Sequence, residues 1–147
     1  MKRVILFLFL AVPLFIVGCS QRENIFDHSE LKAELKEEGI TPKLPTEFPV
    51  NIVEYEKNIP PHETDIYEVI FRGAAGEQFS LIIEPPGVEY NISEKEDVTI
   101  NGNQGFFLEG PGPSIHWTEG DYHYILTYYT EETETKELLM AIAESFQ

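Results

Sequence analysis

Cysteine is nearly absent from this chain, whose 147 residues include only Cys19. One cysteine cannot form a disulfide within the chain, and structural zinc sites draw on several thiolates or imidazoles at close spacing. The folded part must therefore hold together by packing and hydrogen bonds, without covalent cross-links.

Positive charge is also scarce, with 10 Lys and Arg against 26 Asp and Glu and a formal net charge of −16. Such a surface repels the phosphates of nucleic acid, anionic lipid head groups and anionic wall polymers, so none of these is an expected partner. The simplest interpretation is that the acidic surface keeps a protein soluble where it is crowded. A cationic partner, or divalent ions held between clustered carboxylates, is the alternative.

Motifs that mark an enzyme are missing too. The chain has no glycine-rich phosphate loop, no G-x-S-x-G and no H-E-x-x-H. Glu68 and Glu84 fall on neighbouring predicted strands and resemble a pair of opposed carboxylates, but Arg72 nearby favours a surface ion pair. We expect no catalytic residue, no cofactor and no metal.

Long hydrophobic runs are confined to the start of the chain. Lys2 and Arg3 precede an apolar stretch, Val4 to Val17, that only Pro13 interrupts. A membrane-spanning helix needs roughly 20 apolar residues, so this stretch is short for a span. A positive start followed by a short apolar region is typical of a secretory signal peptide.

The apolar stretch ends in Ile16-Val17-Gly18-Cys19. These four residues resemble the lipobox of bacterial lipoproteins, an aliphatic-small-small-Cys pattern. The resemblance implies cleavage between Gly18 and Cys19, and attachment of diacylglycerol, with palmitate-like chains, to the Cys19 thiol. Two acyl chains anchor a protein firmly where one is marginal. We therefore expect a lipid-anchored protein on the outer, extracytoplasmic face of the cell membrane; an uncleaved anchor with a structural cysteine is the alternative.

Three parts follow from this: a signal peptide at 1–18, a lipidated tether at 19–43, and one domain at 44–147. The tether contains a predicted short helix that Asp27 caps and Gly39 ends. Prolines at 42, 45 and 49 then favour an extended path. Loss of Lys2 and Arg3 with the signal peptide takes the formal net charge from −16 to −18.

Beyond the prolines the apolar period becomes two, which predicts antiparallel strands. We expect them near 52–56, 65–72, 77–84, 97–101, 105–109, 114–118 and 122–129. Hairpin turns are predicted at 73–76, Asn101-Gly102 and 119–121. A final helix, capped by Thr135, presents an apolar stripe made of Leu138, Leu139, Ile142, Ala143 and Phe146. The fold class is α+β: a meander of six or seven strands with the helix packed across one face.

Four segments of this domain, "LPTEFPV", "TINGNQGFF", "IHWTEGDYHYIL" and "TKELLMAIAESF", resemble in order those of a bacterial domain of unknown function, family 4367. The family occurs on lipoproteins and on extracellular parts of membrane proteins, largely in Gram-positive spore formers. The resemblance covers about residues 44–147, and it implies a fold and a location but no catalytic residue.

Aromatic side chains gather in the second half of the domain. A candidate ligand face for a lipid, a peptide or another protein comprises Phe106, Phe107, Tyr122, Tyr124 and Tyr128. The alternative is ordinary packing with tyrosine hydroxyls in water. Trp117 is expected in the interior beneath the helix. His116 and His123 are expected as exposed imidazoles near a turn, with a metal held by this pair and a carboxylate as the lesser alternative.

Together these observations predict a lipoprotein with a non-catalytic role in protein interaction or sensing at the cell envelope. The second hypothesis is a carrier that shelters a lipid or other hydrophobic ligand between sheet and helix. An enzyme of unknown class comes third.

Overall fold

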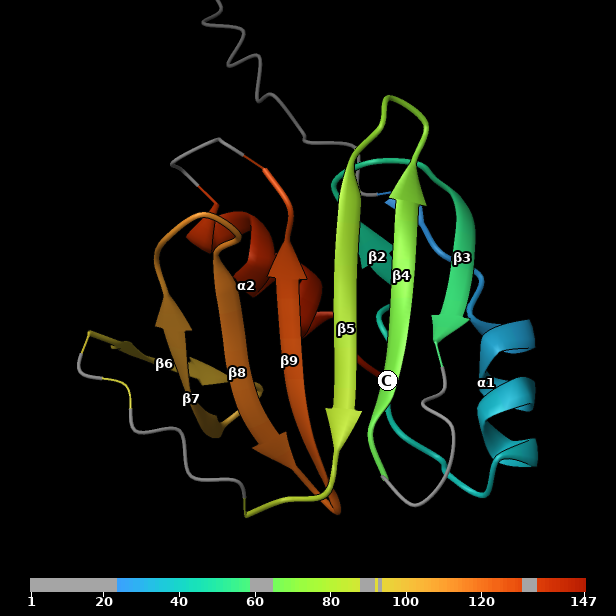
Figure 1. The fold of residues 1–147 in the computed structure, drawn as a ribbon, viewed down its shortest axis with the longest axis horizontal. Coiled ribbons are helices and arrows are strands. Elements are labelled where there is room, and N and C mark those ends of the chain that lie inside the picture. Colours follow the sequence, from blue (N-terminus) through green and yellow to red (C-terminus); the bar gives the residue numbers. More distant parts are fainter. Residues whose placement is uncertain (1–23, 59–64, 88–91, 93, 131–134) are drawn as a thin grey trace, which may run out of the picture.

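The structure, a computed structural model, describes residues 24–58, 65–87, 92, 94–130 and 135–147. It has the predicted α+β fold, with one large antiparallel sheet backed by a C-terminal helix (Figure 1). The large sheet contains β3 (Ile52–Asn58), β4 (Tyr67–Gly73), β5 (Gln78–Glu84), β6 (Glu96–Ile100), β7 (Asn103–Leu108), β8 (Ser114–Glu119) and β9 (Tyr122–Tyr128).

Strand order in this sheet is β3-β4-β5-β9-β8-β7-β6. Consecutive strands pair within β3–β5 and within β6–β9, as a meander requires, but β5 pairs with β9 instead of β6. The two apolar strands thereby meet at the centre, where Leu81 lies opposite Leu126 and Phe79 opposite Tyr128. Alternation in a sequence identifies strands, but it does not identify their neighbours, so this pairing was not predicted.

The predicted turns join the strands. Asn101 and Gly102 both have positive φ angles, 49° and 85°, as the tight turn between β6 and β7 requires. Gly120 has a φ of 62° in the turn between β8 and β9. These hairpins fix the register that decides which side chains face the helix and which face away.

The C-terminal helix α2 (Lys136–Glu144) packs against β8 and β9. Three of its own residues, Leu139, Ile142 and Ala143, are buried on the side that faces the sheet, so the predicted apolar stripe is confirmed. Thr135 does occupy the N-cap position, but its side chain makes no cap hydrogen bond. Its backbone lies in the right-handed helical region (φ −105°, ψ −12°) instead of the extended region typical of a capping residue. The expected cap by the Thr135 hydroxyl is therefore wrong.

The N-terminal helix α1 (Ser29–Glu37) forms as predicted and ends at Gly39, whose φ is +88°. The Ile40 N–H bonds the Leu35 carbonyl at 3.1 Å and the Gly39 N–H bonds the Lys36 carbonyl at 3.1 Å. This pair of bonds is a Schellman motif. At the start of the helix the N-cap position is occupied by His28 and not by Asp27, and no side chain makes a cap hydrogen bond. The Asp27 carboxylate, one residue earlier, accepts a hydrogen bond from the Ser29 N–H at 3.0 Å, so the expected cap by Asp27 is wrong in its position.

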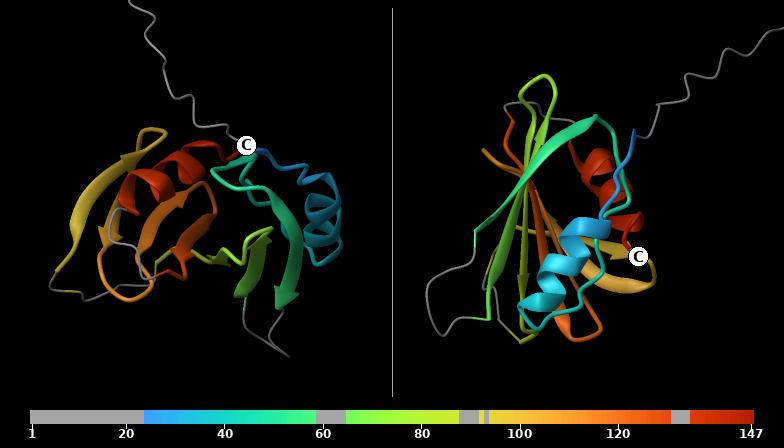
Figure 2. Two further views of the ribbon diagram at one scale, coloured as in Figure 1. Left: turned by 90° about the horizontal axis from the view of Figure 1, so that it is seen from above. Right: turned by 90° about the vertical axis from the view of Figure 1, so that its right-hand side faces the viewer.

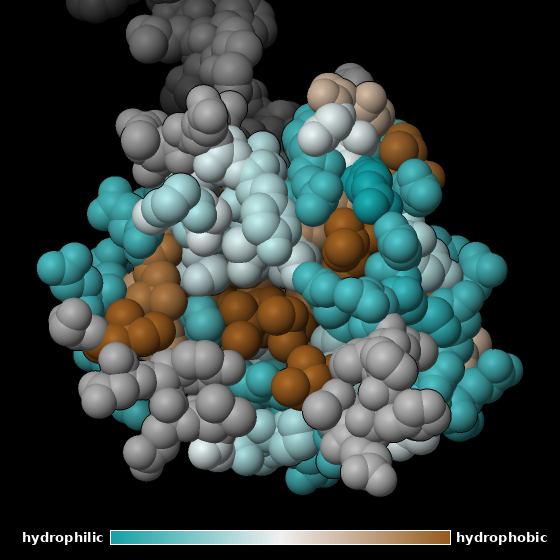
Figure 3. All heavy atoms as spheres, in the orientation of Figure 1, coloured by the Kyte–Doolittle hydropathy of each residue, from teal (hydrophilic) through white to brown (hydrophobic). Residues whose placement is uncertain are grey.

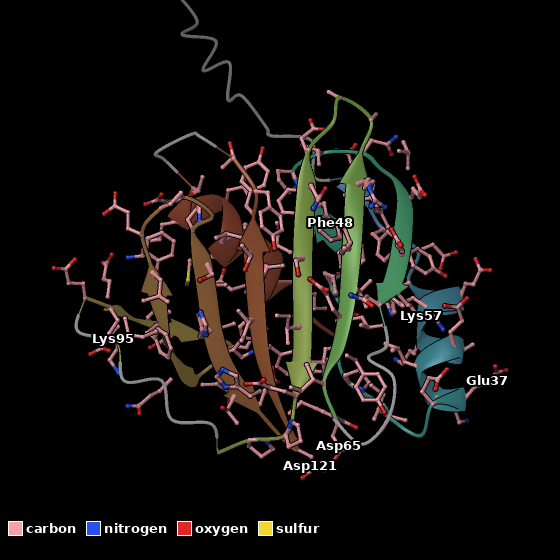
Figure 4. The ribbon with its side chains drawn as sticks, viewed as in Figure 1. Glu37, Phe48, Lys57, Asp65, Lys95 and Asp121 are labelled. Carbon is pink, nitrogen blue, oxygen red and sulfur yellow. The ribbon has the colours of Figure 1, made fainter. Side chains whose placement is uncertain are left out.

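This helix does not belong to a free tether. Leu31 and Leu35 are fully buried, and the Phe26 ring meets Phe48 and Phe71 edge-on at centroid distances of 5.7 and 5.3 Å. A small second sheet pairs β1 (Asn24–Ile25) with β2 (Glu47–Phe48), and Figure 4 places Phe48 behind β4 and β5. Among the described residues, the packed part of the chain thus includes β1 and α1, ahead of the expected start near Leu44.

The C-terminal residue is bonded to the segment that leads into the large sheet. Leu44 and Gln147 exchange two backbone hydrogen bonds of 3.2 and 3.1 Å, so the C-terminus closes against the entry to the domain. Figure 2 shows α1 and α2 on the same side of the sheet.

Candidate functional site

The large sheet has two faces with different surroundings. One face packs against α2 and carries the apolar core. The other, which Figure 1 views from the front, is opposite α2; we call it the open face. Its cross-strand rows include Glu68, Ile82, Ile125, His116 and Phe106 in one row, and Glu84, His123 and Thr118 in the next.

The predicted ligand face lies mostly on the helix side, where its aromatic rings are packed. Phe107, Tyr124 and Tyr128 are 7%, 1% and 8% exposed. Trp117 stacks on Tyr124 at a centroid distance of 5.0 Å, and Phe146 of the C-terminal segment meets Trp117 edge-on at 5.0 Å. These rings fill the space between sheet and helix with contacts. Trp117 is the interior residue that the sequence predicted.

Two tyrosine hydroxyls of the same set hold the chain that enters the domain. The Thr41 N–H donates to the Tyr122 hydroxyl and the Lys43 N–H to the Tyr124 hydroxyl, each at 3.0 Å. Lys43 also forms an ion pair with Glu119. Burial raises the pKa of Tyr124 to about 12, so its hydroxyl keeps its proton at neutral pH. Both tyrosine hydroxyls therefore serve to fix the segment that enters the domain.

Phe106 does not share a surface with Phe107. Consecutive strand residues point to opposite faces, so Phe106 lies on the open face. There its ring stacks on His116 at 4.5 Å with an interplanar angle of 14°, and the Lys95 ammonium lies 5.0 Å from the ring centroid. The five residues of the predicted ligand face thus divide between the two faces of the sheet, and the prediction of a single surface is wrong.

Buried polar side chains occupy the centre of the open face. Glu84, His116 and His123 are 5%, 4% and 7% exposed, so the expectation of exposed imidazoles is also wrong. His116 Nε2 lies 3.0 Å from the Ser114 hydroxyl, and His123 Nδ1 lies 3.0 Å from the Thr118 hydroxyl. These hydrogen bonds to hydroxyl groups replace hydrogen bonds to water that the two imidazoles lose on burial.

Burial also sets the protonation of this pair. It lowers the pKa of His116 to about 4, and the neighbouring His123 adds to that shift. Burial likewise lowers the pKa of His123, against the opposing effect of the Glu84 carboxylate. Both imidazoles are therefore neutral at pH 7, and each offers one donor and one acceptor nitrogen. We refer to Glu84, His116 and His123 as the open-face cluster.

Metal binding by the two histidines would need a further ligand. Their ring centroids lie 6.0 Å apart, so the two histidines lie near each other on one hairpin, as the sequence predicted. Within the described residues, however, no three His, Cys, Asp or Glu side chains are grouped closely enough to hold a metal ion.

The carboxylate pair of β4 and β5 is used differently from the expectation. Glu68 accepts a hydrogen bond from the Ser80 hydroxyl at 2.7 Å, while Glu84 lies opposite His123. Arg72 pairs with Glu56 of the edge strand β3 at 2.9 Å. The expected ion pair of Arg72 with Glu68 and Glu84 is replaced because Glu56 on the neighbouring strand is within reach of the guanidinium.

Beside the cluster the middle strands of the open face carry apolar side chains, and the borders of the face are acidic. Ile70, Ile82 and Ile125 are half-buried there, and Figure 3 shows hydrophobic residues gathered over the middle strands among hydrophilic ones. Carboxylates lie on both edge strands of this face, for example Glu54 on β3 beside Arg72 and Asp97 on β6 beside Phe106. Charged residues on edge strands oppose unwanted strand pairing, so the face rather than the edges is suited to recognition.

The sequence could not reveal the open-face cluster by itself. Alternation does put Ser114, His116 and Thr118 on one face of β8. Glu84 joins them only because β5 pairs with β9, a pairing that connects distant segments of the chain.

Cys19, the expected cleavage site before it and the other lipobox residues lie outside the described residues. Neither helix in the described ranges has the length and apolar character needed to cross a membrane. Comparison with protein-family models, with curated proteins and with solved structures gave no match, so the resemblance to family 4367 rests on the four sequence segments alone.

Proposed function

We propose that this protein is an extracytoplasmic lipoprotein, anchored to the cell membrane through diacylglycerol on Cys19. The observation that carries the proposal is the sequence Ile16-Val17-Gly18-Cys19 at the end of a short apolar run with a positive start.

The domain itself is proposed to bind a protein partner at the cell envelope without catalysing a reaction. The open face supports this role, because half-buried Ile70, Ile82 and Ile125 form an apolar centre that α2 does not cover. An apolar centre with a polar, charged border is the usual composition of a protein interface. The acidic border favours a partner with a basic rim.

The carrier hypothesis is less well supported. It needs a cavity between the sheet and α2, and at that place Trp117, Tyr124 and Phe146 are in mutual ring contact. A ligand of lipid size would have to displace these rings, which costs several kcal/mol for each large side chain moved out of the core.

Two experiments in cells test the proposal. A Cys19→Ala strain should release the protein into the medium or retain the unprocessed form, whereas the parent strain keeps it on the membrane. For the partner, a photoreactive amino acid at Ile82 on the open face is compared with one at Ala141 on the exposed side of α2. We expect a specific crosslinked product from position 82 and none from position 141. The same products from both positions would contradict the assignment of the interface.

A further inference from the structure

Large hydrophobic side chains are exposed at only a few described positions. Ile25, Val53, Tyr129 and Ile66 are 85%, 60%, 53% and 39% exposed. Single exposed apolar residues are ordinary, so their distribution is the informative property.

Val53 and Tyr129 lie at the same end of the sheet. β3 begins at Ile52, opposite Gly73 at the end of β4, and the Ala74 N–H bonds the Asn51 carbonyl at 3.1 Å. The Tyr129 N–H bonds the carbonyl of Gln78, the first residue of β5, at 2.9 Å. The turn between β4 and β5 thus joins both residues to one end, the upper end in Figure 1.

Ile25 borders this end, and Ile66 marks the other. Ile25 is paired with Glu47, on the chain that leads directly into β3. Ile66 immediately precedes β4, so the length of that strand separates it from Gly73. Two exposed alanines, Ala74 and Ala75, form the tip of the β4–β5 turn. We call Ile25, Val53, Ala74, Ala75 and Tyr129 the apolar rim.

The anchor would enter the domain beside this rim. Five residue steps separate Cys19 from Asn24, and an extended chain covers at most about 3.6 Å per residue, or roughly 18 Å in all. A lipid on Cys19 therefore holds Asn24 and the adjacent Ile25 within that distance of the bilayer surface. This short tether favours orientations in which the end of the domain with the rim is closer to the membrane than the end with Ile66.

We propose that the apolar rim rests against the lipid bilayer and orients the domain on it. This inference depends on the lipid anchor proposed above. Aliphatic side chains at the depth of the acyl-chain boundary, with a tyrosine at head-group level, form the usual apolar contacts of a protein that lies on a membrane.

Tethering is necessary for this contact because the rim is small and the protein is acidic. Exposed Glu54 lies beside Val53, and the Glu77 carboxylate accepts a hydrogen bond from the Ala75 N–H at 2.9 Å. The unanchored domain is therefore not expected to bind vesicles. An anchor that holds the rim within a short distance converts a weak contact into an intramolecular one.

This orientation has a consequence for the proposed interface. The strands of the large sheet run away from the rim, so in this orientation they point away from the membrane surface. The open face then looks along the membrane surface. The half-buried Ile70, Ile82 and Ile125 of the open face are then accessible to a partner that lies beside the protein on the same membrane.

The test uses the single thiol. Protein beginning at Cys19 is coupled to a maleimide phospholipid in phosphatidylcholine vesicles whose acyl chains carry bromine, a short-range quencher of tryptophan. An Ala75→Trp variant reports from the rim, and an Asp121→Trp variant reports from the β8–β9 turn at the opposite end. Trp117 is 1% exposed in both variants and provides the constant background.

We expect the emission added by Ala75→Trp to be lost on the brominated vesicles and that added by Asp121→Trp to be kept. Combining Ala75→Trp with Ile25→Ser, Val53→Ser and Tyr129→Ser should restore the emission, whereas combining it with Ile66→Ser should not. Full emission from the rim, or equal quenching at both ends, would overturn the inference. Because the lipid is attached chemically, failure here is distinguishable from failure of lipidation in the cell, which mass spectrometry of the native protein tests.

Discussion

The main-chain N–H of Lys43 donates a hydrogen bond to the hydroxyl of Tyr124 at 3.0 Å, across 81 positions of the sequence. The Thr41 N–H makes the same contact with Tyr122, also at 3.0 Å. A segment whose prolines limit its own backbone bonds is thereby fixed to the β8–β9 hairpin. The path of the chain from α1 into the large sheet depends on these two hydroxyls.

Replacing Tyr124 by Phe should therefore destabilise the protein by about 1–3 kcal/mol, because the Lys43 N–H loses its acceptor in a partly buried place. Tyr122→Phe should cost less, since water reaches its exposed contact with Thr41. Urea unfolding of both variants measures the difference. Equal stability of Tyr124→Phe and the parent protein would show that the contact does not hold the segment.

Gly105 provides a second prediction. It lies opposite Trp117 in the β7–β8 ladder, and a Cβ placed on it would be 2.4 Å from the His116 carbonyl oxygen and 3.0 Å from the Trp117 Cβ. Gly105→Ala must move the backbone of β7 away from that of β8, at a cost of about 1–3 kcal/mol.

The exposed neighbour Gln104 supplies the matched control. Gln104→Ala should change stability by less than about 0.5 kcal/mol, because it alters no packed contact. Thermal unfolding followed at Trp117 measures both variants. A Gly105→Ala protein that unfolds at the temperature of the parent would contradict the close approach of β7 and β8.

His116 should make the protein sensitive to mild acid. Its pKa is about 4 in the folded state against 6.5 for an imidazole in water, so the unfolded chain binds the proton first as pH falls. Stability from this residue is present above pH 6.5 and is lost between pH 6.5 and 4, by up to about 3 kcal/mol at 1.36 kcal/mol per pKa unit.

Unfolding free energies at several pH values, for the parent and for His116→Asn, test this prediction. His123 and Lys95 are the nearby groups whose positive charge would oppose protonation of His116, whereas the Glu84 carboxylate acts mainly on His123. The variant should lose less stability than the parent between pH 6.5 and 5. Parallel curves would mean that His116 does not remain neutral in the folded protein.

Much of this fold could be predicted because its local signals agree with one another. Alternation placed the strands from Ile52 to Tyr128 to within a few residues, and Asn101-Gly102 has the positive φ angles its turn requires. Leu139 and Ile142 marked the buried side of α2. Each of these signals is local in sequence, so no knowledge of tertiary contacts was needed.

Features created by distant segments could not be predicted in this way. β1 and β2 contain two residues each, which is too few to show an apolar period. Their pairing, and the contact of Phe26 with Phe48 that accompanies it, could therefore not be predicted from the sequence. α1 has few apolar residues, yet its two fully buried leucines are enough to hold it once the sheet is present. The open-face cluster likewise required the pairing of β5 with β9.

The candidate site was predicted with less success for the same reason. Phe106 and Phe107 are adjacent in sequence but lie on opposite faces, and His116 is buried beside a hydroxyl that only the folded strand positions. Composition indicated that aromatic and imidazole groups would gather in this region. It did not indicate which of them would be used for packing.

Mass spectrometry of the N-terminus of the protein isolated from its native membrane tests the central claim most directly. We predict that the mature chain begins at Cys19 and that its sulfur carries diacylglycerol. A chain that retains residues before Cys19, or a mature N-terminus with an unmodified thiol, would contradict the lipid anchor and the membrane orientation inferred from it.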